Sequence, residues 1–124
     1  MDGPKFFLLH KNTWWSGWEF VKGDIIPGDS VSESVIKCVK ELTGLNVTKI
    51  DNIPFNYSYN YLKGEKNVDA SIACFVAKTE GAKANISKDY DFYKWGSFET
   101  VMKLLDFEEQ KKLLEFIDKK VLSR

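Results

Sequence analysis

Residues 18–29 and the segment after them have the residue types and order of a loop and helix that hold phosphate groups. The stretch, WEFVKGDIIPGD, carries Lys22 beside a glycine and ends in a Pro-Gly turn. The following segment, SVSESVIKCVKELTGL, has helical period. Sites of this outline hold phosphates near a helix, where carboxylates bind divalent cations that neutralise the phosphate charge. The sequence therefore raises the question of which residues supply those carboxylates.

A second group of candidate binding residues lies in the middle of the chain. Residues 55–62 alternate with period two, so Tyr57, Tyr59 and Tyr61 share one face of a predicted strand. Such a face can stack against a nucleobase, and Lys66 in the adjoining turn can contact phosphate. The same pattern also fits a strand face packed against a helix. Both interpretations stay open.

Other residues with reactive or contact-forming side chains carry less information. His10 ends a predicted strand with no acid or nucleophile at a revealing spacing, so we expect a structural role. Cys38 lies in the helical segment, and burial raises a thiol pKa, so we expect a core residue rather than a nucleophile. Trp14 and Trp15 lie in a polar loop, where binding and packing are equally compatible with their type.

Turn formers and short apolar or alternating runs predict the strands that position these residues. The strands are expected at residues 5–10, 18–22, 46–61, 68–78 and 90–95. Pro54 interrupts the third strand, and a turn at residues 63–67 joins the third and fourth strands as a hairpin.

A helix is predicted at residues 31–43. Ser30 and Glu33 have the spacing of a capping box at its start, and Gly44 supplies the stop. At 100 degrees per residue, one apolar stripe faces the core. It consists of Val31, Val35, Cys38, Val39, Leu42 and Leu45.

Two more helices are predicted after Ser97, and they meet at Asp106. The spacing of Asp106 and Glu109 resembles a second capping box. The last helix places an apolar face toward the core, and its residues are Leu113, Leu114, Ile117 and Val121.

Length and charge limit the class of protein. The 124 residues are expected to form a single domain, 1–124. With 18 basic and 18 acidic side chains, there is no broad field for non-specific binding to nucleic acid or an acidic membrane, so an anion site must be local. The two cysteines suggest a reducing compartment, and the sequence lacks a long apolar run or a leader. We therefore expect a cytoplasmic protein without a membrane partner.

Residues 23–45 resemble the Nudix box, whose pattern is G-x5-E-x7-R-E-U-x-E-E-x-G-U with U a bulky aliphatic residue. The spacing matches without a gap. The box positions are taken by Gly23, Asp29, Lys37, Cys38, Val39, Glu41, Leu42, Gly44 and Leu45.

The resemblance covers nearly the whole chain and points to the diadenosine tetraphosphate hydrolase branch of the Nudix superfamily. Residues 18–23 are similar to its W-x-F-P-K-G entry, with Val21 in place of proline, and residues 86–95 to its L-S-x-E-H-x-x-Y-x-W segment. The resemblance places Asp89 on a glutamate often used as a metal ligand, and Tyr93 on a matching aromatic. It implies an α+β fold, an α/β/α sandwich with a mixed β-sheet flanked by the box helix and the C-terminal helices.

One departure from the family pattern concerns the first strand. The family usually begins with a strand of the type A-G-A-x-x-x-R, and this sequence starts after that point. We expect either a shorter sheet or an edge filled by an upstream segment, a partner protein or a second copy in a homodimer.

A second departure concerns the metal ligands. Carboxylates at i, i+3 and i+4 of a helix share one face, and magnesium prefers their oxygens. By the resemblance these positions are Cys38, Glu41 and Leu42. Leucine has no ligand atom, and a thiol is too soft for magnesium. Lys37 keeps the charge of the family's arginine and lacks its planar fork.

Three functions follow as hypotheses. The first is a Nudix-fold protein with a degraded catalytic box that binds a nucleotide, dinucleoside polyphosphate or RNA end with weak or no hydrolysis. The second is an active Mg²⁺-dependent hydrolase, with Glu41 catalytic and Glu41, Asp89 and Asp29 as metal ligands, helped by Glu19 or Asp24. The third is a protein-interaction subunit. The expected nucleotide- or phosphate-binding residues are Lys22, Lys37, Tyr57, Tyr59, Lys66 and Tyr93.

Overall fold

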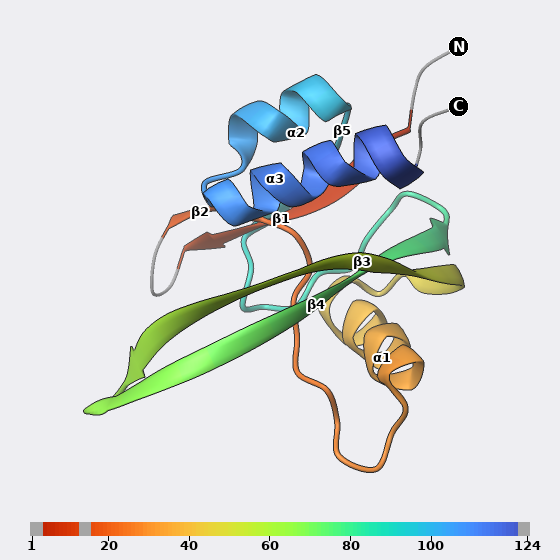
Figure 1. The fold of residues 1–124 in the computed structure, drawn as a ribbon. Helices are drawn as coiled ribbons and strands as arrows, with labels where there is room; N and C mark the ends of the chain where they lie inside the picture. The colour runs from red at the N-terminus through yellow and green to blue at the C-terminus, as the bar shows by residue number, and fades with distance from the viewer. Residues whose placement is uncertain (1–3, 13–15, 122–124) are drawn as a thin grey trace.

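The computed structural model describes residues 4–12 and 16–121, in which two groups of helices enclose the strands (Figure 1). Trp14 and Trp15 lie outside the described residues. In chain order the elements are β1 (Phe6–Asn12), β2 (Ser16–Glu19), α1 (Val31–Thr43), β3 (Asn46–Lys63), β4 (Lys66–Glu80), β5 (Phe92–Gly96), α2 (Phe98–Leu104), α3 (Glu108–Phe116) and the π-helical turn η1 (Ile117–Val121). No helix in this part of the chain is long and apolar enough to cross a membrane.

The described strands form two antiparallel sheets. One has the order β2-β1-β5, and the other is the β3–β4 hairpin. In the central strand β1, Leu9 lies opposite both Glu19 of β2 and Tyr93 of β5. Helices α2 and α3 lie on one side of the strands and α1 on the other, as Figure 1 shows. The expected α+β fold with helices on both sides is confirmed.

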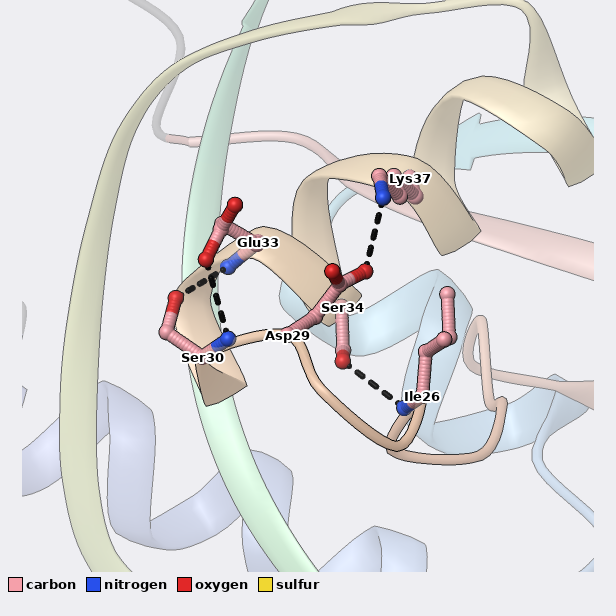
Figure 2. Close-up of polar contacts among 6 residues, drawn as sticks. All are labelled: Ile26, Asp29, Ser30, Glu33, Ser34 and Lys37. Carbon is pink, nitrogen blue, oxygen red and sulfur yellow. Dashed lines mark hydrogen bonds and ion pairs between the residues drawn. The ribbon is translucent and has the colours of Figure 1, made fainter.

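Local signals set both ends of α1, as predicted. The Ser30 hydroxyl accepts a hydrogen bond from the Glu33 backbone N–H at 3.1 Å, and the Glu33 carboxylate accepts one from the Ser30 N–H at 2.9 Å (Figure 2). These bonds lower the pKa of Glu33. At the other end Gly44 has φ of 74°, a left-handed conformation that glycine adopts without steric cost. The capping box and the glycine stop are therefore confirmed.

The β3–β4 hairpin is longer than predicted and runs through Pro54. The strand absorbs the proline in a register shift between Ile53 and Asn56, where the ladder needs no N–H from residue 54. A two-residue turn with Gly64 at φ of 67° joins the strands. Across the hairpin the Asn60 amide donates to Asp69. The hairpin was predicted, whereas the interruption at Pro54 is an irregularity within one strand.

Two buried clusters form the core. The first contains Leu8, Val101, Leu105 and Leu114, and the second contains Ile53, Cys74, Leu113 and Ile117. Phe6 and Phe20 pack against both, so they join the three-stranded sheet to the hairpin through α3. The predicted apolar face of the last helix is confirmed for its described side chains; that of Val121 is outside them.

The predicted capping box at Asp106 is wrong. Phe107 is the N-cap residue of α3, and no side chain caps this helix end. The Asp106 carboxylate instead accepts a hydrogen bond from the Trp18 backbone N–H at 2.8 Å, which ties β2 to the helical layer. The Asp106 carboxylate therefore bonds to a residue far away in the sequence and not, as the local pattern predicted, to the N-terminus of α3.

The predicted stripe of α1 is only partly buried. Val39 and Leu45 are buried, whereas Val31 is 40% exposed. Val31 lines an open pocket of about 650 Å³ between the loop ahead of α1 and the hairpin. Two polar residues of α1 outside the predicted stripe, Ser34 and Thr43, are buried, and their hydroxyls form hydrogen bonds with backbone groups.

Candidate functional site

The loop ahead of α1 is folded back onto the first turns of the helix. The Ile26 N–H donates to the Ser34 hydroxyl at 2.9 Å (Figure 2). The Asp29 N–H donates to the Ile26 carbonyl at 3.1 Å. The Lys37 ammonium lies 2.7 Å from the Asp29 carboxylate, which raises the pKa of Lys37. The structure therefore brings the predicted residues Asp29 and Lys37 together, as a pair that faces solvent.

Cys38 is the point where the loop touches the middle of α1. A Cβ added to Gly23 would lie only 2.3 Å from the Cys38 sulfur, so only glycine lets the loop approach this closely. Burial, followed by the charges of Glu41 and Asp24, raises the pKa of the Cys38 thiol. The thiol is therefore neutral at pH 7 and packs under the loop. The sequence predicted a core residue, whereas Cys38 is only partly buried and belongs to neither core cluster.

The last turn of α1 is hydrogen-bonded to a segment far away in the sequence that carries Asp89. The backbone N–H of Asn85 donates to the Thr43 carbonyl at 2.8 Å, and that of Ser87 donates to the Leu42 carbonyl at 2.9 Å. The Ser87 hydroxyl in turn lies 3.3 Å from the Asp89 carboxylate. Two predicted acidic residues, Glu41 and Asp89, thus belong to segments that meet at this end of the helix.

The donor set does not fit a magnesium ion. Among residues 4–12 and 16–121, no group of three or more His, Cys, Asp or Glu side chains is arranged to hold a metal. Leu42 offers no ligand atom, and the neutral Cys38 thiol is a poor partner for magnesium. Asp29 is already paired with Lys37. Nudix hydrolases generally use Mg²⁺ or a similar divalent metal.

Lys22 connects the loop to the tyrosine face of β3. Its ammonium donates to the Tyr59 hydroxyl at 3.4 Å and lies 5.4 Å from the centre of the Tyr59 ring. It also lies 3.8 Å from the Glu19 carboxylate. The structure thus unites the predicted residues Lys22 and Tyr59, which are 37 positions apart.

Glu19 was expected only as a helper of a metal site, and the sequence did not indicate that its side chain is buried. It is only 2% exposed, and its pKa is raised by burial against the opposing charges of Lys22 and Lys11. Lys22, Lys11 and Tyr90 each oppose that rise in the pKa of Glu19. The alternation of Trp18, Glu19 and Phe20 suggests that the acid faces solvent, and no local signal reveals its burial.

The three tyrosines of β3 divide between packing and exposure. Tyr57 packs against the second core cluster, and burial raises its pKa to about 12. Tyr59 and Tyr61 are exposed, with ring centres 5.9 Å apart. The packing interpretation holds for Tyr57, whereas the other two rings are free to contact a ligand.

The remaining predicted residues lie elsewhere. Lys66 begins β4 beside the hairpin turn, and Tyr93 stacks on Phe7 within the three-stranded sheet at 5.5 Å between ring centres. His10 pairs with Asp91 at 2.7 Å and packs edge-on against Trp18, which agrees with its predicted structural role.

Comparisons with known proteins agree with this geometry. The family model described as NUDIX domain matches residues 1–118. The mouse bis(5'-nucleosyl)-tetraphosphatase (asymmetrical) is 24% identical over 112 residues, which cover 90% of this chain and 76% of the mouse protein.

Solved structures share the fold. A Caenorhabditis elegans Ap4A hydrolase in a binary complex aligns with a TM-score of 0.73 at 20% identity, covering 97% of this chain and 88% of that one. The NUDIX domain of Shewanella oneidensis NrtR, complexed with ADP ribose, aligns with a TM-score of 0.74 at 16% identity, covering 94% and 77%. The expected membership of the Nudix family is thereby confirmed. The chain belongs to the Nudix domain family.

Proposed function

We propose that this Nudix domain binds a nucleotide, a dinucleoside polyphosphate or an RNA end through local contacts that need no metal, with weak or no hydrolysis. The observation that carries the proposal is the composition of α1. At the three helix positions that hold metal in the family resemblance, the chain has Cys38, Glu41 and Leu42. Gly23 closes over the first of them.

The ligand-binding part of the site supports recognition of a phosphate and a base together. The Lys22 ammonium is half-exposed and held by Tyr59, so a phosphate can reach it without an opening of the core. The exposed Tyr59 and Tyr61 rings lie beside it and offer a surface on which a base can stack. A second cation, Lys37 of α1, pairs with Asp29 of the loop ahead of that helix.

The names of similar proteins guide the choice of ligand. A relative is called a bis(5'-nucleosyl)-tetraphosphatase, and a structural neighbour binds ADP ribose. Bis(5'-nucleosyl) tetraphosphates and ADP ribose both join a nucleoside to a short phosphate chain. We infer the same class of ligand for this chain, and a cytoplasmic location, which suits its free thiols Cys38 and Cys74.

Calorimetric titration in EDTA tests the binding proposal. Diadenosine tetraphosphate, ATP and a capped dinucleotide are titrated into the wild-type protein and into Lys22→Gln. We expect micromolar binding of at least one ligand and about 10- to 100-fold weaker binding by Lys22→Gln, since one charge-assisted contact is worth about 1.5–3 kcal/mol. The control is Lys49→Gln, which removes a more exposed lysine from the hairpin. No heat with any ligand refutes the proposal.

The alternative is a Mg²⁺-dependent hydrolase of diadenosine tetraphosphate-like substrates. The docking of residues 85–87 on α1 favours it, because that contact brings the Asp89 segment to the helix that carries Glu41. To bind the metal, the Asp29 carboxylate would then have to break its ion pair with Lys37. A hydrolysis assay with magnesium decides: turnover that Glu41→Gln abolishes supports the enzyme and contradicts the binder.

A third function, as a protein-interaction subunit, is supported by the two-stranded sheet. Within the described residues, β3 and β4 pair only with each other, so each has an edge open to a further strand. Light scattering coupled to gel filtration measures whether the chain forms a homodimer. A strictly monomeric chain that binds nucleotide supports the first function alone.

A further inference from the structure

Glu19 is the one buried carboxylate among the residues that the structure describes. It lies on β2, immediately ahead of the loop that carries Lys22 and Gly23. Its Oε1 atom is buried and accepts no hydrogen bond. A buried charge of this kind is costly unless a cation or donor compensates it, so the neighbours of Glu19 decide how it is tolerated.

The nearest cation is Lys22, which reaches from the surface toward this carboxylate. Its ammonium lies 3.8 Å from Glu19 Oε1, and its side chain is 38% exposed. On its other side it donates to the Tyr59 hydroxyl and lies over that ring. Lys22 is thus held between a buried anion on β2 and an aromatic ring on β3.

The other groups that interact electrostatically with Glu19 are Lys11, Tyr57 and Tyr90. Lys11 lies over the Tyr90 ring at 5.8 Å. Of the two cations, Lys22 is the one that also contacts Tyr59. Lys22 is therefore the cation that transmits the charge of Glu19 to the ligand-binding face formed by Lys22 and Tyr59.

We propose that Glu19 is a positioning residue: it holds Lys22 in place and competes with the ligand for its charge, so that it sets the affinity for phosphate. This inference rests on the proposed function. A phosphate that approaches Lys22 meets an ammonium already shared with a carboxylate less than 4 Å away. Replacing that carboxylate with an uncharged amide leaves the full charge of Lys22 to the ligand and removes a like charge from behind it.

The first experiment is a double-substitution cycle. Wild type, Glu19→Gln, Lys22→Gln and the double variant are titrated with ATP in EDTA. We expect Glu19→Gln to bind about tenfold more tightly than wild type, a change of about 1.4 kcal/mol. In the Lys22→Gln background the same substitution should change the affinity less than about twofold. An unchanged affinity in folded Glu19→Gln, or an equal gain in both backgrounds, overturns the inference.

Two further readouts do not need a ligand. Acetylation of lysines followed by mass spectrometry should modify Lys22 several times faster in Glu19→Gln, with Lys49 as the internal reference. In Lys22→Gln the buried carboxylate loses its nearest cation, so this variant should melt a few degrees below wild type, whereas Lys49→Gln should not. This second comparison stands even where Glu19→Gln fails to fold.

These readouts separate the inference from the proposed function. Lack of ATP binding by every variant overturns the proposed function, and with it the effect of Glu19 on affinity. Faster acetylation of Lys22 in Glu19→Gln would in that case still support the positioning of Lys22 by Glu19. Unchanged acetylation together with an unchanged melting temperature of Lys22→Gln refutes that positioning.

Discussion

Replacing Gly23 with alanine tests how closely the loop packs on α1. The new Cβ would lie 2.3 Å from the Cys38 sulfur, more than 1 Å inside the 3.4 Å at which ordinary contact begins. Gly23 does not have a left-handed φ, so the effect comes from this approach rather than from backbone strain. Either the thiol must rotate or the loop must lift from the helix.

The expected cost is that of overpacking, about 1–3 kcal/mol. For a chain of this size, about 1 kcal/mol corresponds to roughly 3–5 °C in melting temperature. Gly23→Ala should therefore melt about 3–15 °C below wild type in a thermal scan followed by circular dichroism. Chemical denaturation on the same samples gives the free energy of unfolding directly.

The matched control removes the sulfur. In a Cys38→Ala background, Gly23→Ala should cost less than about half as much, because only the Cβ of residue 38 remains, at 3.3 Å. A Gly23→Ala variant as stable as wild type would refute the packing of the loop on the thiol. An equal cost in both backgrounds would place the clash elsewhere.

Three more predictions concern the ends of α1 and the buried acid. Ser30→Ala removes the hydroxyl that accepts from Glu33 and should lower the free energy of unfolding by about 1 kcal/mol in chemical denaturation, while Ser32→Ala, beyond the cap, should change it by less than about 0.5. Gly44→Ala meets a φ of 74° and a Cβ contact of 3.2 Å with Asn85, so a loss of about 1–2 kcal/mol is expected in the same assay. Burial raises the pKa of Glu19 above 4.5, so the folded state holds this proton more firmly than the unfolded state. The stability that Glu19 contributes should therefore be fully present below pH 4.5 and be lost as pH rises through the raised pKa, so denaturation across this range should show wild type losing stability relative to Glu19→Gln.

The parts of the fold that the sequence predicted depend on local signals. The bounds of α1 follow from Ser30, Glu33 and Gly44, all within one turn of the helix ends. The hairpin follows from alternation and a turn of two residues. Each of these interactions joins residues close in the chain, so it can be predicted from a single sequence.

The features that could not be predicted involve partners far apart in the chain. Asp106 accepts from Trp18, 88 positions away, and Gln110 accepts from Phe20, 90 positions away. Both contacts fix β2 under the C-terminal helices, and the Lys22 contact with Tyr59 likewise depends on how the hairpin folds over the loop. The burial of Glu19 results from this packing, which no periodicity of residues 16–20 expresses.

The candidate site was predicted only in part for the same reason. Lys22 and Tyr59 meet, as do Asp29 and Lys37, whereas Lys66 and Tyr93 lie in other parts of the structure. The family resemblance aligns residues along the chain and does not state which of their side chains lie close together in the fold.

The most direct test of the central claim is the magnesium dependence of nucleotide affinity. Diadenosine tetraphosphate is titrated into the same protein sample in EDTA and in millimolar magnesium, with the reaction products analysed afterwards. A metal-independent site predicts dissociation constants that agree within about twofold and a ligand recovered intact. Binding that tightens more than about tenfold with magnesium, with cleavage that Glu41→Gln abolishes, would contradict the account.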